Sequence, residues 1–516
     1  MQLICNLMEP SMNPTHHQRA KRRWSRACAA MMTLIAVNLA GCASSSGLRP
    51  SGELLDPAAL AMQRTLGNDP ASADAWPSED WWTGLGDAQL SGLVEEALKG
   101  NPDLSAADAR ARQALALAGA ADADRGPAIN ANASLNGQRQ PTSVVPADSG
   151  GGTFGLTKAV NLSFSWGLDL WGGKRAAWAA AVGQARAADI DARAARIEVS
   201  TNVARAYAQL GYAYAQDDVA RAEQSRAAQV LILTRQRVAK GIDNELQRKR
   251  AESDVASADQ QQAAAAWSIA SARIALAVLL GRGPDRGLDI ARPHLLLPTT
   301  VAMPANLPAD LLGRRADLVA ARWQVAAASQ NILAAKAQFL PNLSISALAG
   351  FAAQGGATLF SAPSRAYQVQ PAISLPIFDG GRLRSNLAGQ DASYDLAVAS
   401  YNKTLIGALN QVADHLNAAQ SLQLQVKAQQ RALDLARESW QLAERRYQSG
   451  VGSYLEALSV RQQLLAADQR VAALHAQQVD LSVQLIQALG GGFRPQADDV
   501  QLAAESPSNS NKKAVP

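Results

Sequence analysis

The sequence predicts an α+β membrane protein: a duplicated unit supplies four strands to a transmembrane β-barrel, which a long α-helical coiled-coil barrel continues. Three observations support this: an internal repeat, four segments of alternating polarity, and two long stretches without proline. Residues 101–104 (NPDL) recur as 315–318 (RADL), and residues 280–281 (LG) recur as 489–490, each about 210 residues later. Such a duplication is typical of a structural wall rather than of a catalytic cleft.

The composition favours packed helices and excludes nucleic acid as a partner. Aromatic residues make up only 5% of the 516-residue chain, and alanine is abundant, which suits helices lying side by side. The formal net charge is +5, but most of it comes from arginines and a lysine among residues 1–41. No basic stripe remains in the rest of the chain for binding a phosphate backbone.

The N-terminus has the features of an export signal. A basic region at 21–26 precedes a mostly apolar stretch at 27–40 that is too short for a comfortable membrane span. It ends in Leu-Ala-Gly before Cys42, which resembles the signal of bacterial lipoproteins. An ordinary signal peptide with a chance cysteine is the alternative. We predict a lipoprotein signal peptide over 1–41, a covalent lipid on Cys42, and a lipid-anchored N-terminal segment over 42–86.

The remaining residues give no sign of catalysis or metal binding. The other two cysteines leave with the signal peptide, so the mature chain has no thiol nucleophile and no thiolate metal site. His294, His415 and His475 show no spacing typical of zinc ligands. No nucleophile elbow of the form Gly-x-Ser-x-Gly is present. We therefore expect no catalytic residue, no metal and no cofactor apart from the lipid.

The first structural repeat is predicted over 87–281. A helix over 89–125 is ended by Pro127. Apolar residues then alternate with Asn, Ser and Gly over 129–136 and, after a loop, over 160–170, which predicts two strands. The proline-free stretch that follows predicts a long helical hairpin; its first helix, at 174–239, would span about 100 Å at 1.5 Å per residue.

The second structural repeat, over 315–490, follows a Pro-rich linker over 282–314. Strands are predicted over 343–351 and 367–377, although Pro371 is a mild objection to a central strand. A heptad pattern then predicts coiled-coil packing. Its positions are Val398, Leu405, Val412, Ala419, Val426, Leu433, Trp440 and Tyr447. The tail over 491–516 is polar, and we predict that it is disordered.

Four amphipathic strands cannot form a membrane channel alone. Each has an apolar face suited to lipid and a polar face suited to water. Lipid does not tolerate an unpaired sheet edge, and four strands cannot close around a useful lumen. The chain must therefore combine its strands with those of identical copies.

The chain resembles the TolC-like outer-membrane efflux proteins, in particular their NodT or OprM-like lipoprotein branch. The motif at 375–382 (LPIFDGGR) is the most specific match, supported by the lipoprotein signal, the duplication and the helix break at 447–454. The resemblance implies a homotrimer whose β-barrel lies in the outer membrane and whose helices extend into the periplasm. It implies docking to a periplasmic adaptor protein and an inner-membrane pump, passive conduction of exported small molecules, and no enzyme activity.

The resemblance also implies functional residues at the helix tips. Candidates for the periplasmic gate are Tyr447, Glu456 and Ser459. Glu456 matches an acidic ring position, whereas Ser459 stands where an aspartate is common. Glu456 is equally explained as an acid favoured at a helix N-terminus. Candidates for adaptor contact are Gly241, Leu246, Gly450, Gly452 and Leu455.

One alternative function remains open at this point. A lipid-anchored periplasmic coiled-coil adaptor without a barrel would also have long helices. The long, uniform alternation of the strands favours the channel. The transported substrate and the class of pump are not encoded in any recognisable motif.

Overall fold

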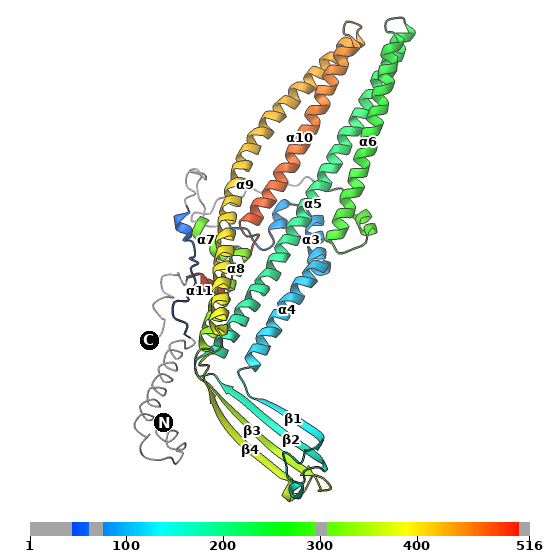
Figure 1. Ribbon diagram of the computed structural model, residues 1–516. Coiled ribbons are helices and arrows are strands. Elements are labelled where there is room, and N and C mark those ends of the chain that lie inside the picture. The colour runs from blue at the N-terminus through cyan, green and yellow to red at the C-terminus, as the bar shows by residue number, and fades with distance from the viewer. Residues whose placement is uncertain (1–43, 61–75, 295–306, 505–516) are drawn as a thin grey trace, which may run out of the picture. The chain divides into compact units, whose positions relative to one another are not determined.

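The computed structural model describes residues 44–60, 76–294 and 307–504 (Figure 1). They form two compact units. Unit 1 contains the sheet and the adjoining helix ends, at 119–180 and 328–395, together with the N-terminal residues up to 51; unit 2 contains the remaining helices. The predicted signal peptide and Cys42 lie outside the described residues.

The sheet in unit 1 has the four predicted strands in sequence order. They are β1 Ala128–Arg139, β2 Phe154–Leu168, β3 Asn342–Gln354 and β4 Arg365–Ser374, all antiparallel in the order β1-β2-β3-β4. In the register, Ala131 pairs with Leu162, Leu162 with Ala349, and Ala349 with Tyr367, so apolar residues share one face. Pro371 lies in β4, opposite Ile345 of β3, so the strand forms despite the proline.

The helical hairpins repeat with equal lengths. They consist of α5 Gly173–Ala239 with α6 Glu245–Leu279, and α9 Arg382–Gln448 with α10 Tyr454–Ala488. The first helix has 67 residues and the second 35 in both hairpins. The helices before the strands, α4 Pro102–Ala123 and α8 Ala316–Ala337, have 22 residues each. The structure therefore confirms the duplication.

The prediction of one helix over 89–125 is wrong. The structure has α3 Ala88–Gly100 and α4 Pro102–Ala123, separated by Asn101. Asn101 has an extended backbone, and its side-chain oxygen accepts a hydrogen bond from the amide of Asp103 at 2.8 Å. Pro102 is well suited to the first position of a helix. Asn101 therefore caps a new helix rather than continuing the old one.

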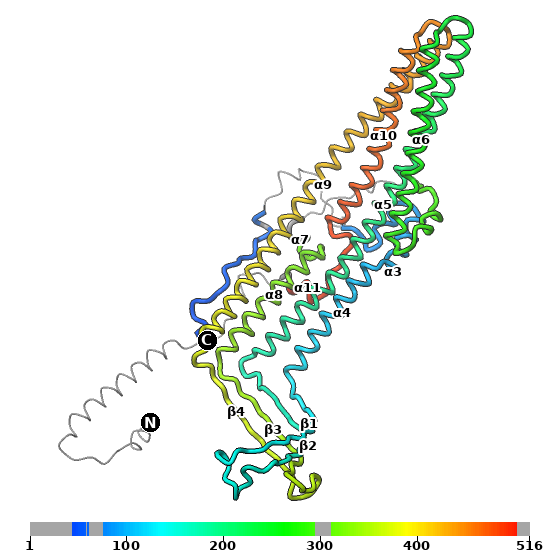
Figure 2. Tube along the Cα trace, turned by 45° about the vertical axis from the view of Figure 1, so that its right-hand side comes forward, coloured from blue at the N-terminus to red at the C-terminus, as the bar shows by residue number. Residues whose placement is uncertain are grey.

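The described part of the N-terminal segment packs on the helices. A short 3₁₀ helix, η2 Trp81–Leu85, buries both of its ends in the main core of unit 2. Within unit 1, Ser51 donates from its amide and its hydroxyl to Asp395 of α9 at 2.9 and 2.8 Å. Within unit 2, the amide of Leu55 donates to Asn402 of α9 at 2.9 Å (Figure 2). The segment also contains η1 Pro57–Ala59.

The remaining connections are more ordered than predicted. The linker holds η4 Pro284–Asp289 and α7 Leu307–Arg314, and the two strand loops hold η3 Ala147–Ser149 and η5 Ala362–Ser364. The predicted disorder over 491–516 is wrong for residues 491–504, which include α11 Ala497–Ala504; residues 505–516 lie outside the described residues.

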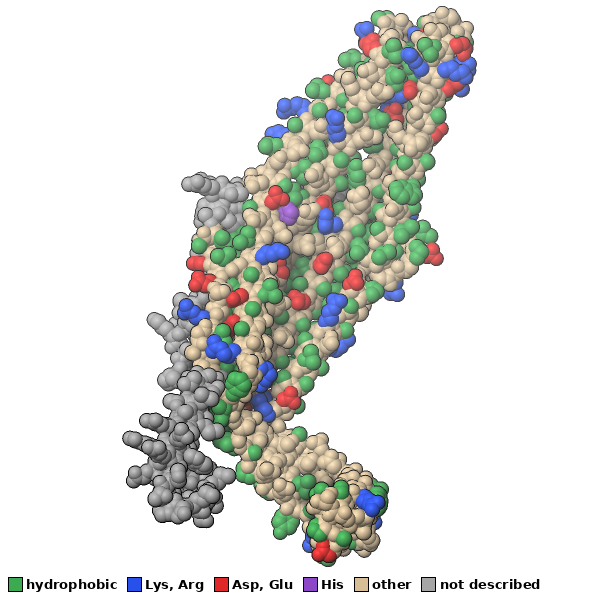
Figure 3. All heavy atoms as spheres, in the orientation of Figure 1, with side chains coloured by type: hydrophobic (Ala, Val, Ile, Leu, Met, Phe, Trp, Pro, Cys, Tyr) green, Lys and Arg blue, Asp and Glu red, His purple; other side chains and the backbone are tan. Residues whose placement is uncertain are grey.

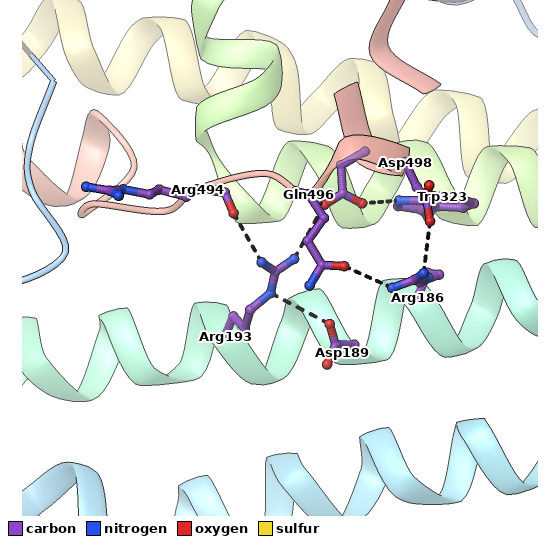
Figure 4. A network of polar contacts seen from close by, with 8 residues as sticks. Arg186, Asp189, Arg193, Trp323, Arg494, Gln496 and Asp498 are labelled. Carbon is purple, nitrogen blue, oxygen red and sulfur yellow. Dashed lines mark hydrogen bonds and ion pairs between the residues drawn. The ribbon is translucent and has the colours of Figure 1, made fainter. Parts of the chain in front are cut away.

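Buried polar contacts hold α11 in place (Figure 4). The Asp499 carboxylate accepts hydrogen bonds from the Trp323 indole at 2.8 Å and from Arg193 at 3.5 Å. Arg186 of α5 also pairs with Asp498 at 2.9 Å. The polar composition of this segment therefore did not indicate disorder, because its charged residues are paired with side chains of α5 and α8.

Candidate functional site at the helix tips

Both helical hairpins turn at the same end of unit 2 (Figure 1). Gly241 has φ +70° and Gly450 has φ +81°, so each glycine supplies the left-handed conformation that ends its first helix. Asn244 caps α6 in a reciprocal capping box with Gln247, and Ser453 caps α10 by accepting from the amide of Glu456 at 3.1 Å. Local sequence thus determines both turns.

Each turn exposes a pair of apolar side chains. Leu246 and Leu455 are both 58% exposed, and Ile242 and Val451 are 56% and 73% exposed. The two leucines were predicted as contact candidates, whereas Ile242 and Val451 were missed although they occupy matching positions in the two repeats. Each hairpin therefore ends in two exposed apolar side chains at matching positions: Ile242 and Leu246 in the first hairpin, Val451 and Leu455 in the second.

The predicted contact glycines divide into two kinds. Gly241 and Gly450 are exposed. Gly452 is buried, and a Cβ added there would lie 3.1 Å from the backbone carbon of Arg446. Gly452 is therefore required for the close packing of its own turn and offers little surface to a partner.

Tyr447 is buried in a polar cluster that joins the two hairpins. Its hydroxyl lies 2.9 Å from Thr234 of α5 and donates to Asp243 of the first turn at 2.9 Å. Arg237 of α5 pairs with Asp243 at 2.7 Å and donates to the backbone oxygen of Tyr447 at 3.0 Å. We call Thr234, Arg237, Asp243 and Tyr447 the tip cluster.

Electrostatics hold the tip cluster in one protonation state around neutral pH. Burial alone would raise the pKa of Asp243, but the hydrogen bonds from Arg237 and Tyr447 outweigh it and lower the pKa. Burial raises the pKa of Tyr447. Asp243 is therefore an anion and Tyr447 a neutral donor over the ordinary pH range.

A second cluster extends from the start of α10 along the helices. Arg461 of α10 is only 4% exposed; its Nε lies 3.0 Å from Glu223 of α5, and its Nη2 lies 3.2 Å from Asp254 of α6. Tyr454 donates to the same Asp254 at 2.6 Å, and burial raises the pKa of this tyrosine. We call Glu223, Asp254, Tyr454 and Arg461 the inner cluster. It links α10 to both helices of the first hairpin.

The three predicted gate residues are not equivalent in the structure. Tyr447 is 1% exposed, whereas Glu456 and Ser459 are exposed and lie one turn apart on α10. Glu456 lies in the first turn of α10 and forms an ion pair with Arg446 at 3.3 Å. That arrangement fits the helix N-terminus explanation and also leaves its carboxylate open to solvent.

Sequence reasoning missed the residues that connect the hairpins. Arg237, Asp243, Glu223 and Arg461 were not singled out, because each resembles an ordinary charge on a helix surface. Their partners in the other hairpin lie more than 200 residues away, beyond any local periodicity. A charged residue at a heptad position that should face a neighbouring helix is the sequence signal that could have identified such residues.

Comparison with known proteins identifies the family to which the chain belongs. The family described as "Outer membrane efflux protein" matches residues 93–282 and 307–491, one match for each repeat. The chain belongs to the outer membrane efflux protein family. Members of this family are efflux channels rather than enzymes, and the predicted location in the outer membrane is confirmed.

Individual members support the family assignment. The chain is 38% identical to the fusaric acid resistance protein FusA of Burkholderia cepacia, covering 70% of this chain and 69% of FusA. It is 31% identical to the multidrug resistance outer membrane protein MdtP of Escherichia coli strain K12, covering 82% and 88%. The crystal structure of the outer membrane protein VceC of Vibrio cholerae superimposes with a TM-score of 0.77 at 36% identity, covering 81% of this chain and 100% of VceC.

These comparisons confirm two further predictions. The fold class is that of solved outer-membrane channels of the family. The function is that of an outer-membrane channel component of an efflux system. Both results favour the channel over the alternative of an adaptor without a barrel.

Proposed function

We propose that three copies of this chain form one continuous duct, which receives small molecules from an inner-membrane pump through a periplasmic adaptor. The observation that carries the proposal is the open sheet: among the described residues, β1 and β4 each have a neighbouring strand on one side only. An unpaired edge is not stable in hydrocarbon, so the β1 edge of one copy must pair with the β4 edge of the next. Three copies would give a barrel of about twelve strands, wide enough for a lumen.

Exposed apolar surface on the helices supports assembly of identical copies. By length and composition α6 is apolar enough to cross a membrane, yet only 22% of its most apolar stretch is buried. Trp267 and Val278 on this helix are 70% and 65% exposed. Helix α9, at the opposite edge of the helical layer (Figures 1 and 2), exposes Leu424 by 71% and Leu442 by 60%. Packing α6 against the α9 of a neighbouring copy would cover both surfaces.

The tips would be both the gate and the docking surface. By holding the second hairpin against the first, the tip cluster and the inner cluster would keep the duct closed. The exposed apolar pairs at the turns, Ile242 with Leu246 and Val451 with Leu455, would contact the helical hairpins of the adaptor. Glu456 and Ser459 would line the narrow end of the lumen.

The lipid anchor would lie beside the membrane end of the helices. Arg384, near the start of α9, donates to the backbone oxygen of Ser44 at 2.5 Å. Cys42 precedes Ser44 by two residues in the sequence. Replacing Cys42 by Ser should abolish labelling of the protein by radioactive palmitate, and persistent labelling would contradict the proposed lipoprotein signal.

The proposal includes no catalytic step and no cofactor. Transport energy would come from the pump, and the helices and strands would provide only a passage. The direct test is planar-bilayer recording of the purified protein, combined with membrane fractionation and gels of unheated and heated samples. We expect ion conductance and heat-sensitive mobility in the outer-membrane fraction. A protein released from membranes by detergent-free buffer, without conductance, would favour an adaptor.

A further inference from the structure

Charge is distributed unevenly over the four strands. They contain three charged residues, Arg139, Lys158 and Arg365, and all three are basic. Each lies near the end of its strand that leads to a loop rather than to a helix. On the face in view, Figure 3 shows Lys and Arg side chains at the loop end of the sheet and none along its middle. We call Arg139, Lys158 and Arg365 the outer belt.

The register places the outer belt on the apolar face of the sheet. Lys158 pairs with Leu135, and Arg139 pairs with Phe154. Arg365 pairs with Phe351, which in turn pairs with Val160. Paired residues point to the same face, and residues two apart along a strand share a face. All three cations therefore lie on the face that carries Ile129, Phe164 and Ile345, the face that a membrane barrel turns toward lipid.

Lys158 lies at the height where the hydrocarbon ends; in the register, Arg139 is level with Phe154, four residues nearer the loops, and Arg365 is level with Val160, two residues nearer the helices. Leu168 is the last residue of β2 on the helix side, and Lys158 is ten residues before it, about 33 Å along the strand at 3.3 Å per residue. With a strand tilt of about 40°, this corresponds to a height of about 25 Å, which matches the apolar band of an outer-membrane barrel. Exposed aromatic rings neighbour two of the cations, as in an interfacial girdle: Phe154 pairs with Arg139, Tyr367 lies two residues after Arg365, and Phe360 packs on Phe351, the partner of Arg365.

The cations of the outer belt have no partner within the sheet. Among the described residues, no carboxylate lies within ion-pair distance of any of the three. Arg139 and Arg365 are exposed and Lys158 is half-buried. The opposite face of the strands, which carries Asn132 hydrogen-bonded to Ser163 at 3.0 Å, is polar but uncharged. The cations therefore do not serve the water-filled side.

We propose that the outer belt binds the phosphate groups of an anionic phosphorylated glycolipid in the outer leaflet of the membrane. Unpaired cations at the edge of hydrocarbon are stabilised by lipid phosphates, whose oxygens accept several hydrogen bonds from arginine and lysine. The proposal rests on the trimeric barrel, since only there does the apolar face meet lipid. Three copies would present three such sites around the barrel. The bound lipid would fix the depth of the barrel in the membrane.

The test uses the full-length trimer in detergent and bis-phosphorylated lipid A as the probe. Native mass spectrometry counts bound lipid for the wild type and for the variant with Arg139→Gln, Lys158→Gln and Arg365→Gln. Loss of three charges near lipid phosphates should weaken binding about tenfold or more. A charge-preserving variant, Arg139→Lys with Arg365→Lys, should keep most of the binding.

A matched control removes three exposed cations outside the sheet, one from the first turn and two from α9: Lys240→Gln, Lys427→Gln and Arg431→Gln. This control should bind lipid A like the wild type, and lipid A without phosphates should bind weakly to every variant. If the triple variant is trimeric, conducts ions and binds lipid A like the wild type, the proposed lipid site is wrong while the trimeric barrel stands. A wild-type protein that is monomeric in detergent would overturn the barrel and the outer belt together.

Discussion

The two hairpin tips have the same geometry but different chemistry. Their helices have identical lengths, so each residue of one tip has a counterpart in the other. Tyr447 corresponds to Val238, and Arg461 corresponds to Glu252. The first tip supplies Arg237 and Asp243, whereas the second supplies the tyrosine that binds them. Duplication determined the shape, and divergence made the two tips complementary rather than interchangeable.

The largest expected effect comes from breaking the inner cluster. Replacing Arg461 by Ala removes the cation that joins Glu223 to Asp254. Glu223 keeps Arg226 at 3.1 Å, so the expected cost is that of lost contacts to charged groups, roughly 1.5–3 kcal/mol. The thermal midpoint of the helical circular-dichroism signal should fall clearly. Replacing the exposed Arg470 of the same helix by Ala is the matched control. Equal midpoints for both variants would show that the inner cluster does not stabilise the helices.

A smaller effect is expected from one hydroxyl in the tip cluster. Tyr447→Phe removes the contacts to Asp243 and Thr234, at a cost of about 1–2 kcal/mol. If these contacts hold the closed form, the open time in planar bilayers should rise about 5- to 30-fold. Tyr212→Phe removes a hydroxyl bonded to Gln216 on its own helix and should leave gating unchanged. An open time in Tyr447→Phe that equals that of the control would exclude the tip cluster as a lock.

The tip cluster should also limit the pH range of the closed form. The lowered pKa of Asp243 stabilises the cluster above the ordinary aspartate value of about 4, and this stabilisation is lost as pH falls through the lowered pKa. The raised pKa of Tyr447 stabilises the cluster below about pH 10, and this is lost as pH rises through the raised pKa. Conductance should stay low between about pH 5 and 9 and rise on either side.

Two variants separate the acid and alkaline effects. Asp243→Asn should remove the increase in conductance at acidic pH, and Tyr447→Phe should remove the increase at alkaline pH. A steep change in conductance near neutral pH that survives in both variants would place the titrating group elsewhere.

The smallest effect concerns the exposed acid of the second tip. Glu456→Gln should reduce cation selectivity modestly, because Arg446 at 3.3 Å already offsets part of its charge. Arg446→Gln should raise the selectivity by freeing the carboxylate. Gln247→Glu places an acid at the matching position of the first tip and should leave reversal potentials unchanged. Unchanged selectivity in both Glu456→Gln and Arg446→Gln would remove Glu456 from the lumen.

The sequence predicted the elements far better than their contacts. Alternation identified all four strands, and the absence of proline identified the 67-residue helices, because both are local signals. The break at Asn101 was missed because helical spacing continues across it. The order of α11 was missed because its charges are paired with Arg186 and Arg193, some 300 residues away in the chain. Partners so distant cannot be inferred from periodicity in one sequence.

The central claim is that identical chains complete the barrel. Light scattering of the detergent-solubilised protein, corrected for bound detergent, measures the number of chains in each particle directly. The account predicts a particle of three chains that withstands dilution. A particle of one chain, with both sheet edges paired inside it, would contradict the account.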